Sequence, residues 1–228
     1  MVVRVVTKSA VEAIGADLRL RLFSGDLGQD AVLTESEVAA TYEVARPTAK
    51  AAIEKLVAEG LLVRGANKSA RVPALGPADV RDIYRSRAYL ESEVLRRLAG
   101  VRAVPAGAAQ ANADIAVAGG SPVGIVEPDM RFHMCLVDAL DSPRTSRMYR
   151  SLVSEVRLCM SQVQGRELLP AGLIHDEHAR LLELIAAGDG EAAVALLEEH
   201  LGRARELLVE AVGGVAGPEA RVPSALRP

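Results

Sequence analysis

The chain has 228 residues, half of them hydrophobic and only 3% aromatic. This length corresponds to one or two domains, and cores built from Leu, Val, Ala and Ile favour helical packing. The two cysteines, Cys135 and Cys159, fall in apolar helical patterns and give no disulfide framework. The first residues lack an apolar signal core, and no apolar run reaches the roughly 18 residues of a membrane span. We therefore expect a cytoplasmic protein with no membrane partner.

The net charge of −3 is unevenly distributed along the chain. Residues 1–76 carry ten Lys or Arg and nine Asp or Glu, whereas residues 77–228 carry 17 and 21. Within residues 45–72, six basic residues accompany two acidic ones, a local net charge of +4. A local basic excess is the electrostatic footprint expected of a segment that binds nucleic acid.

A helix is predicted over about residues 10–23, and residues 33–72 then predict two further helices joined by a tight turn. Thr34 and Glu37 have the spacing of a capping box, which starts a short helix over residues 35–41.

The second of these helices begins at Arg46, with Pro47 in the first turn, where a missing N–H is harmless. Gly60 can end this helix, and residues 61–64 and 70–72 then read as two short strands. The pattern predicts a winged helix-turn-helix. Periodicity alone fits an ordinary helical hairpin with a β-ribbon equally well. The inward face of the helix that begins at Arg46 would carry Ala49, Ala52, Ile53 and Leu56.

The same segment resembles the DNA-binding domain of the GntR family of bacterial transcription regulators. The resemblance implies that Arg46 and Lys50 contact DNA and that Ser36 and Thr48 touch its backbone. We add Lys68, between the two predicted strands, as a DNA contact. The matching residues are Leu33, Thr34, Glu35, Glu37, Val38, Ala39, Val44, Arg46, Pro47, Thr48, Ile53, Leu56, Glu59, Gly60 and Leu61.

The segment departs from the family pattern at three places. Ala45 stands where the family usually has Ser or Thr, so a helix cap worth about 1 kcal/mol is absent. Lys50 replaces an arginine and cannot form the bidentate fork to guanine as well as arginine does. Ser69 and Ala70 replace a glycine-threonine pair in the wing. A different interpretation keeps the winged helix as a protein-interaction module without DNA.

A Pro/Gly linker at residues 73–77 precedes a change to long amphipathic helices. We predict a DNA-binding domain with its linker at residues 1–76, an effector- and metal-binding domain at residues 77–212, and a disordered tail at residues 213–228. The fold class is mainly α: an N-terminal winged helix-turn-helix with a small β-ribbon, and a C-terminal all-helical antiparallel bundle. The bundle helices are expected at about residues 78–100, 105–118, 128–140, 142–163, 171–187 and 189–212.

Four polar residues interrupt the apolar stripes of these helices. Asp129 and His133 are four residues apart on one buried face. His178 lies ten residues before the turn at residues 188–189 and His200 eleven after it, so both are about 15 Å from that turn. Burying a carboxylate and three imidazoles without partners is costly, and one divalent metal ion would satisfy all four.

Nitrogen and oxygen ligands suit Zn, Ni, Mn or Fe, and the ligand types alone do not choose between these metals. Any one of the histidines by itself would be read as a hydrogen-bonded core residue, and their conjunction is what favours a metal. His175 lies three residues before His178, within chelating reach, and is the alternative ligand at that position.

The helical region resembles the FCD-type ligand-binding domain of the FadR-like branch of the GntR family. The resemblance implies an all-helical bundle in which Asp129, His133, His178 and His200 bind the metal. At residues 142–144 a Ser-Pro-Arg sequence replaces the family's usual glycine-asparagine pair. The matching motifs are D-x-x-F-H with Asp129, Phe132 and His133, E-H with Glu177 and His178, and a final motif with Ala193, His200 and Leu201.

Arg87 lies on the inward stripe of the first bundle helix and allows two interpretations. It either pairs with Glu91 at i+4 or anchors an anionic effector beside the metal. The whole pattern predicts a metabolite-responsive DNA-binding regulator, a homodimer and, by the family's habit, a repressor. A small organic or sugar acid would bind at or near the metal and alter binding to double-stranded operator DNA.

The alternative is a metal-dependent enzyme in which the same Asp/His site activates water. Against this alternative, the sequence has no nucleophile motif, no Gly-rich phosphate loop and no separate inward carboxylate that could act as a general base. Asp176 and Glu177 lie near the site in sequence but are predicted to face solvent. We therefore expect a regulator without catalytic residues.

Overall fold

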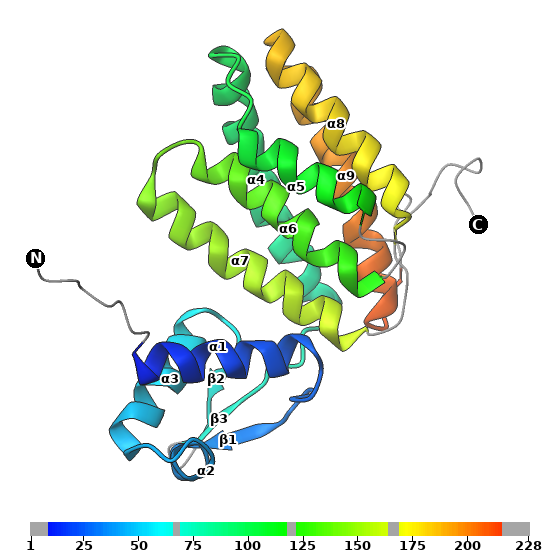
Figure 1. Ribbon diagram of the computed structural model, residues 1–228. Helices are drawn as coiled ribbons and strands as arrows, with labels where there is room; N and C mark the ends of the chain where they lie inside the picture. The colour runs from blue at the N-terminus through cyan, green and yellow to red at the C-terminus, as the bar shows by residue number, and fades with distance from the viewer. Residues whose placement is uncertain (1–8, 66–68, 118–121, 164–168, 216–228) are drawn as a thin grey trace, which may run out of the picture. The chain divides into compact units, whose positions relative to one another are not determined.

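The computed structural model describes residues 9–65, 69–117, 122–163 and 169–215 (Figure 1). The chain divides into two compact units, Met1–Ala74 and Leu75–Pro228. Two predictions fall outside the described residues: the DNA contact of Lys68, and most of the disordered tail, from residue 216 onward.

The described residues of the first unit form three helices and a small antiparallel sheet with the strand order β1-β3-β2. Buried aliphatic side chains from all three helices, among them Leu18, Val38 and Ile53, form its core. The elements are α1 (Ala10–Phe23), β1 (Val32–Thr34), α2 (Glu35–Thr41), α3 (Arg46–Ala58), β2 (Val63–Arg64) and β3 (Ser69–Arg71).

The predicted capping box of α2 is present. The Glu37 N–H donates to the Thr34 hydroxyl at 3.1 Å, and the Thr34 N–H donates to the Glu37 carboxylate at 3.1 Å. By contrast, α3 follows Ala45 with no side-chain cap and has Pro47 in its first turn. Helix α2 therefore begins where its capping box places it, and α3 begins at the predicted Arg46 without a side-chain cap.

The sheet differs from the predicted two-stranded ribbon in two respects. An additional strand, β1, pairs with β3 and sets the buried Leu33 opposite Ala70. The strand predicted over residues 61–64 is shortened to β2, because the N–H groups of Leu61 and Leu62 bond back to the Leu56 carbonyl at the end of α3. The helix terminus therefore takes two residues that the apolar run had suggested for a strand.

The second unit is a helical bundle, which confirms the mainly α fold class. Its long helices are visible in Figure 1, where α8 and α9 form an antiparallel hairpin. The core consists almost wholly of Leu, Val, Ile and Ala with a few aromatic side chains. The helices are α4 (Pro77–Gly100), α5 (Ala106–Val117), α6 (Pro122–Asp138), α7 (Pro143–Gln162), α8 (Ala171–Ala187) and α9 (Gly190–Ala211).

The start of α6 and the turn between α8 and α9 fix the positions of the helices in this unit that carry its buried polar residues. Helix α6 begins at Pro122 and runs through Pro128, which the sequence had suggested as its start. The buried face continues across this proline from Ile125 to Met130, and packing outweighs the local preference of proline for a helix end. Between α8 and α9, Gly188 adopts φ 82° and the Asp189 carboxylate accepts from the Ala192 N–H at 3.1 Å.

Candidate metal centre

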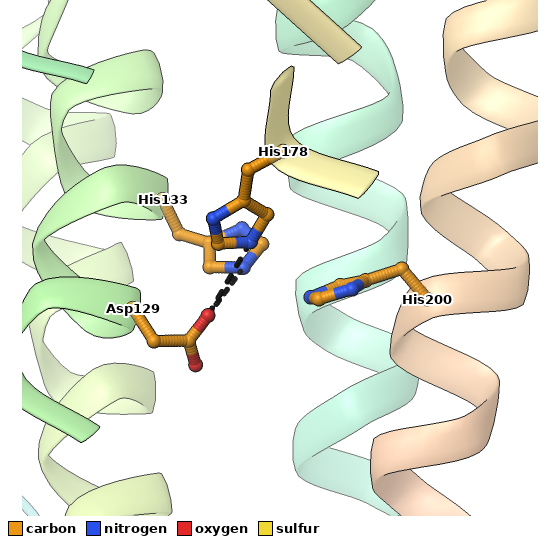
Figure 2. Close-up of side chains that lie close together, drawn as sticks. All are labelled: Asp129, His133, His178 and His200. Carbon is orange, nitrogen blue, oxygen red and sulfur yellow. Dashed lines mark ion pairs between the residues drawn. The ribbon is translucent and has the colours of Figure 1, made fainter. Parts of the chain in front are cut away.

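Asp129, His133, His178 and His200 converge inside the second unit (Figure 2). Asp129 and His133 come from consecutive turns of α6, His178 from α8 and His200 from α9. One potential ligand atom of each residue lies within 4.8 Å of those of the other three. The three imidazoles are buried, and the Asp129 side chain is 18% exposed.

The close approach of His178 and His200 follows from the α8–α9 hairpin. Their rings lie 5.0 Å apart, measured between centroids, as their similar distance from the turn had suggested. His175 lies one turn away, half-exposed, with its Nδ1 atom 3.1 Å from Asp176. The alternative ligand is therefore not part of the cluster.

Several buried polar atoms of the cluster lack hydrogen-bond partners among the described residues. They are Asp129 Oδ1, His133 Nε2 and both ring nitrogens of His178. Asp129 Oδ1 lies 3.6 Å from His133 Nε2 and 3.3 Å from His178 Nε2, beyond good hydrogen-bond length. Buried polar atoms are normally satisfied, and lone pairs converging at these distances suit a divalent cation. The residues present fit a metal ion.

Electrostatics favour neutral imidazoles at His178 and His200 beside an ionised carboxylate. Burial, together with its neighbour His200, lowers the pKa of His178 well below its usual value, and burial lowers the pKa of His200 to about 4. Burial acts to raise the pKa of Asp129, but the surrounding histidines, His133 first, lower it below its usual range. Neutral imidazole and carboxylate are the forms that bind metals.

Glu91 on α4 connects this cluster to Arg87. The Arg87 Nε–H donates to Glu91 Oε1 at 3.0 Å, and the Tyr149 hydroxyl donates to the same oxygen at 2.7 Å. Glu91 Oε2 lies 2.5 Å from His133 Nδ1. Burial acts to raise the pKa of Glu91, but the charges of His133 and Arg87 lower it to about 2. Glu91 is therefore an anion, and His133 Nδ1 is the donor.

Arg87 shows features of both predicted interpretations. It forms the intrahelical pair with Glu91, and both side chains are only 1% exposed. Its Nη2 group nevertheless has no hydrogen-bond partner among the described residues, and its guanidinium carbon lies 5.1 Å from the centroid of the Tyr84 ring. A buried cation with an unused donor beside a candidate metal centre can receive an anion.

The prediction that Glu177 faces solvent is wrong. Its side chain is 11% exposed, with Oε2 2.8 Å from His200 Nδ1 and Oε1 in an ion pair with Arg203. The sequence motif does not predict a structural role for Phe132. In the structure its ring stacks on that of His178, with 3.7 Å between the ring centroids and an angle of 6° between the ring planes. Glu177 directly precedes His178 in the sequence, but its contacts are with His200 and Arg203 of α9, which the pattern of α8 alone does not predict. Asp176 is 79% exposed, as expected.

In the first unit, the N-terminal turns of α3 present Arg46 and Lys50 to solvent. Among the described residues neither side chain forms an ion pair. Three neighbouring basic residues are already paired: Lys55 with Glu12, Arg64 with Glu54 and Glu35, and Arg71 with Asp30. Ser36 is exposed at the start of α2, and Thr48 is half-buried. Arg46 and Lys50 therefore place two exposed cations, without ion pairs among the described residues, in the first turns of α3.

Two family models match the chain. The model of the bacterial regulatory proteins of the gntR family matches residues 10–72, and the FCD domain model matches residues 82–203, more than half of the chain. The chain belongs to the GntR family and carries an FCD domain. This agrees with the resemblance of the two motif sets, and it makes the chain a transcription regulator rather than an enzyme.

Similar proteins agree with this membership. The HTH-type transcriptional regulator BphR of Paraburkholderia xenovorans (strain LB400) is 26% identical over 209 residues, 85% of this chain and 83% of that protein. The Nta operon transcriptional regulator of Aminobacter aminovorans is 26% identical over 194 residues, 80% and 86% of the two chains. The crystal structure of a GntR transcriptional regulator from Rhodococcus sp. RHA1 has a similar fold, with a TM-score of 0.77 and 23% sequence identity. The matched region covers 90% of this chain and 99% of that one.

The fold and family together describe a regulator of the GntR family with a helix-turn-helix and a helical FCD domain. Within the part of the chain that the structure describes, no helix is long and apolar enough to cross a membrane. The FCD domain contains the Asp/His cluster as a group of residues that could hold a metal ion.

Proposed function

We propose that this GntR regulator binds operator DNA through residues 1–76 and senses a small organic or sugar acid through residues 77–212. The acid would bind at or near a divalent metal ion and release the DNA, so that the protein acts as a repressor. The observation that carries the proposal is the convergence of one carboxylate and three imidazoles, of which Asp129 Oδ1, His133 Nε2 and both ring nitrogens of His178 lack hydrogen-bond partners within the described residues.

The DNA-binding half of the proposal rests on α3. Arg46 and Lys50 are exposed cations in its first turns, where backbone N–H groups and the helix dipole also favour phosphate. We assign base contacts to these two side chains and backbone contacts to Ser36, Thr48 and Lys68. Because Lys50 is a point charge, most of the base discrimination falls to Arg46.

For the metal, we assign Asp129, His133, His178 and His200 as ligands. This set of one oxygen and three nitrogen donors is compatible with Zn, Ni, Mn or Fe. When bound, the ion would supply a positive charge that attracts the carboxylate of the effector. The protein's own contribution is to hold three imidazoles and one carboxylate at a buried point.

For the effector, we assign Arg87 as the anchor. Its Nη2 group has no hydrogen-bond partner within the part of the chain that the structure describes, and the guanidinium is held by Glu91 and the Tyr84 ring. A carboxylate could therefore accept from Arg87 and approach the metal at once. In a homodimer whose two helix-turn-helix units bind half-sites roughly one or more DNA turns apart, a small reorientation of the helical domains would change operator affinity.

The DNA half is tested by gel shift on the DNA upstream of the protein's own gene. Arg46→Ala should abolish the shift, whereas Arg64→Ala, which removes a cation already paired with Glu54 and Glu35, should weaken it much less. Binding by neither the wild type nor Arg64→Ala would contradict operator recognition. Equal losses in both variants would contradict the assignment of Arg46.

The sensing half is tested by whole-protein metal analysis and by calorimetry. A double variant, His133→Ala with His200→Ala, should lose the metal found in the wild type. Carboxylate binding should weaken when the metal is chelated, and an affinity that does not change on chelation would contradict the metal-linked arrangement. A thermal-shift screen of organic and sugar acids should identify the effector, because a ligand that binds only the folded state raises the melting temperature.

A further inference from the structure

Two carboxylates outside the ligand cluster contact its histidines on the ring nitrogen that faces away from the other ligands. Glu91 Oε2 lies 2.5 Å from His133 Nδ1, and Glu177 Oε2 lies 2.8 Å from His200 Nδ1. An ionised carboxylate only accepts hydrogen bonds, so each Nδ1 atom carries the hydrogen. In a neutral imidazole the other nitrogen, Nε2, then has the lone pair.

The two contacts share one arrangement, although they lie on different helices. Each carboxylate gives one oxygen to an arginine and the other to an imidazole. Glu91 Oε1 accepts from Arg87 at 3.0 Å, and Glu177 Oε1 pairs with Arg203. The arginines are almost as buried as the carboxylates, with side-chain exposures of 1% and 12%. Each carboxylate is therefore held on one side and cannot rotate freely away from its histidine.

We propose that Glu91 and Glu177 are positioning residues that fix His133 and His200 in the Nδ1–H form, so that Nε2 of each ring is the metal ligand. This inference rests on the proposed metal site. For His133 the orientation agrees with the cluster, since its Nε2 atom faces Asp129 Oδ1 at 3.6 Å and has no hydrogen-bond partner among the described residues.

His178 provides the contrast within the same site. Within the described part of the chain, neither of its ring nitrogens has a hydrogen-bond partner, and its ring is oriented by stacking on Phe132 at 3.7 Å. Asp129 Oδ1 lies 3.3 Å from His178 Nε2 without forming a hydrogen bond, so among the described residues no hydrogen-bonded carboxylate selects the protonated nitrogen of His178. A change at Glu91 or Glu177 should therefore alter the histidine it contacts and leave the protonation pattern of His178 as it was.

The first test measures affinity for zinc, used alone as the probe, by competition with a chromogenic chelator on the full-length chain. Glu91→Gln and Glu177→Gln should each bind zinc about 10–100-fold more weakly, the usual cost of removing a group that orients a metal ligand. Glu93→Gln on α4 and Glu183→Gln on α8 are the matched controls. Both of these residues form exposed ion pairs on the same helices, and their variants should bind zinc like the wild type.

The second test reads the histidines directly, by two-bond proton–nitrogen correlation spectra of the zinc-loaded wild type. His133 and His200 should show a protonated Nδ1 and a metal-bound Nε2. In Glu177→Gln the pattern of His200 should change while that of His178 does not. A merely structural role would lower the melting temperature of the metal-free protein without changing this pattern. If Glu91→Gln does not fold, the wild-type spectrum and the Glu177→Gln variant still test whether a carboxylate fixes the protonated ring nitrogen.

The outcomes separate the two levels of the proposal. A wild type that binds zinc while both glutamine variants keep its affinity would overturn the positioning role alone. Zinc bound through Nδ1 of His133 or His200 would overturn it as well. A wild type that binds no zinc, nickel, manganese or iron would overturn the metal site itself, and this inference with it.

Discussion

Arg87→Met tests how much the second unit depends on its buried ion pair. The substitution keeps an unbranched side chain but leaves the Glu91 carboxylate, 1% exposed, without its cation. Removing one partner of a buried pair costs about 3–5 kcal/mol. Because Glu91 keeps its bonds from Tyr149 and His133, we expect the lower end of that range, about 3 kcal/mol. For a chain of this size that corresponds to a drop of about 6–12 °C in melting temperature.

The measurement is urea unfolding of the metal-free protein followed by circular dichroism. The matched control is Arg97→Met, which breaks another i, i+4 pair on α4, between Arg97 and Glu93, whose side chains are 66% and 53% exposed. An exposed pair of this kind contributes about 0.3–0.5 kcal/mol. If the two variants lost similar stability, burial would not be what makes the Arg87–Glu91 pair important, and the reasoning would be refuted.

Three further predictions concern pH, base reading and helix capping. The metal-free protein should lose stability as the pH falls below about 6.5, by about 1.4 kcal/mol per pH unit for each of His178 and His200, measured by urea unfolding at pH 7 and pH 5. Lys50→Arg should sharpen discrimination at a guanine in the operator by about 1 kcal/mol, whereas Lys55→Arg, at a cation paired with Glu12, should not. Ala45→Ser should supply the missing cap of α3 and stabilise the first unit by about 1 kcal/mol, measured by thermal unfolding.

The sign of the pH effect follows from which state binds protons. Burial lowers the pKa of His178 well below its usual value and that of His200 to about 4. Below pH 6.5 the unfolded chain takes up protons that the folded chain refuses, until the pH reaches those folded values. Burial acts to lower the pKa of His133, but Glu91 together with Asp129 raises it overall, so its contribution to stability is complete below pH 6.5 and is lost only at higher pH. Unchanged stability between pH 7 and pH 5 would contradict this account.

The parts of the fold that local sequence determines were predictable. Thr34 and Glu37 mark the start of α2 because a capping box is formed by residues three apart. His178 and His200 are about equally far from the turn at residues 188–189 in sequence. Because the rise per residue of a helix is nearly constant, this spacing predicts that they lie side by side on α8 and α9. Both predictions needed only geometry within one helix or one hairpin.

The predictions that failed depended on contacts between distant segments. Strand β1 exists because Leu33 pairs with Ala70, 37 residues away in the sequence, and three residues give no periodicity to detect. Glu177 was expected to face solvent because its own helix places it beside the buried stripe, whereas His200 and Arg203 of α9 enclose it. Pro128 suggested a helix start from local preference, and the packing of α6 overrides that preference.

The order of the four cluster residues along the chain determines when the site can form during synthesis and folding. Asp129 and His133 are synthesised first, and His200 is the last of the four to leave the ribosome. Domains fold as units once their sequence is complete, so the site cannot close until α9 has packed. A chain clipped within the α8–α9 turn would keep three of the four residues but lose His200. The metal content of a purified sample would then report whether each molecule carries an intact C-terminal helix.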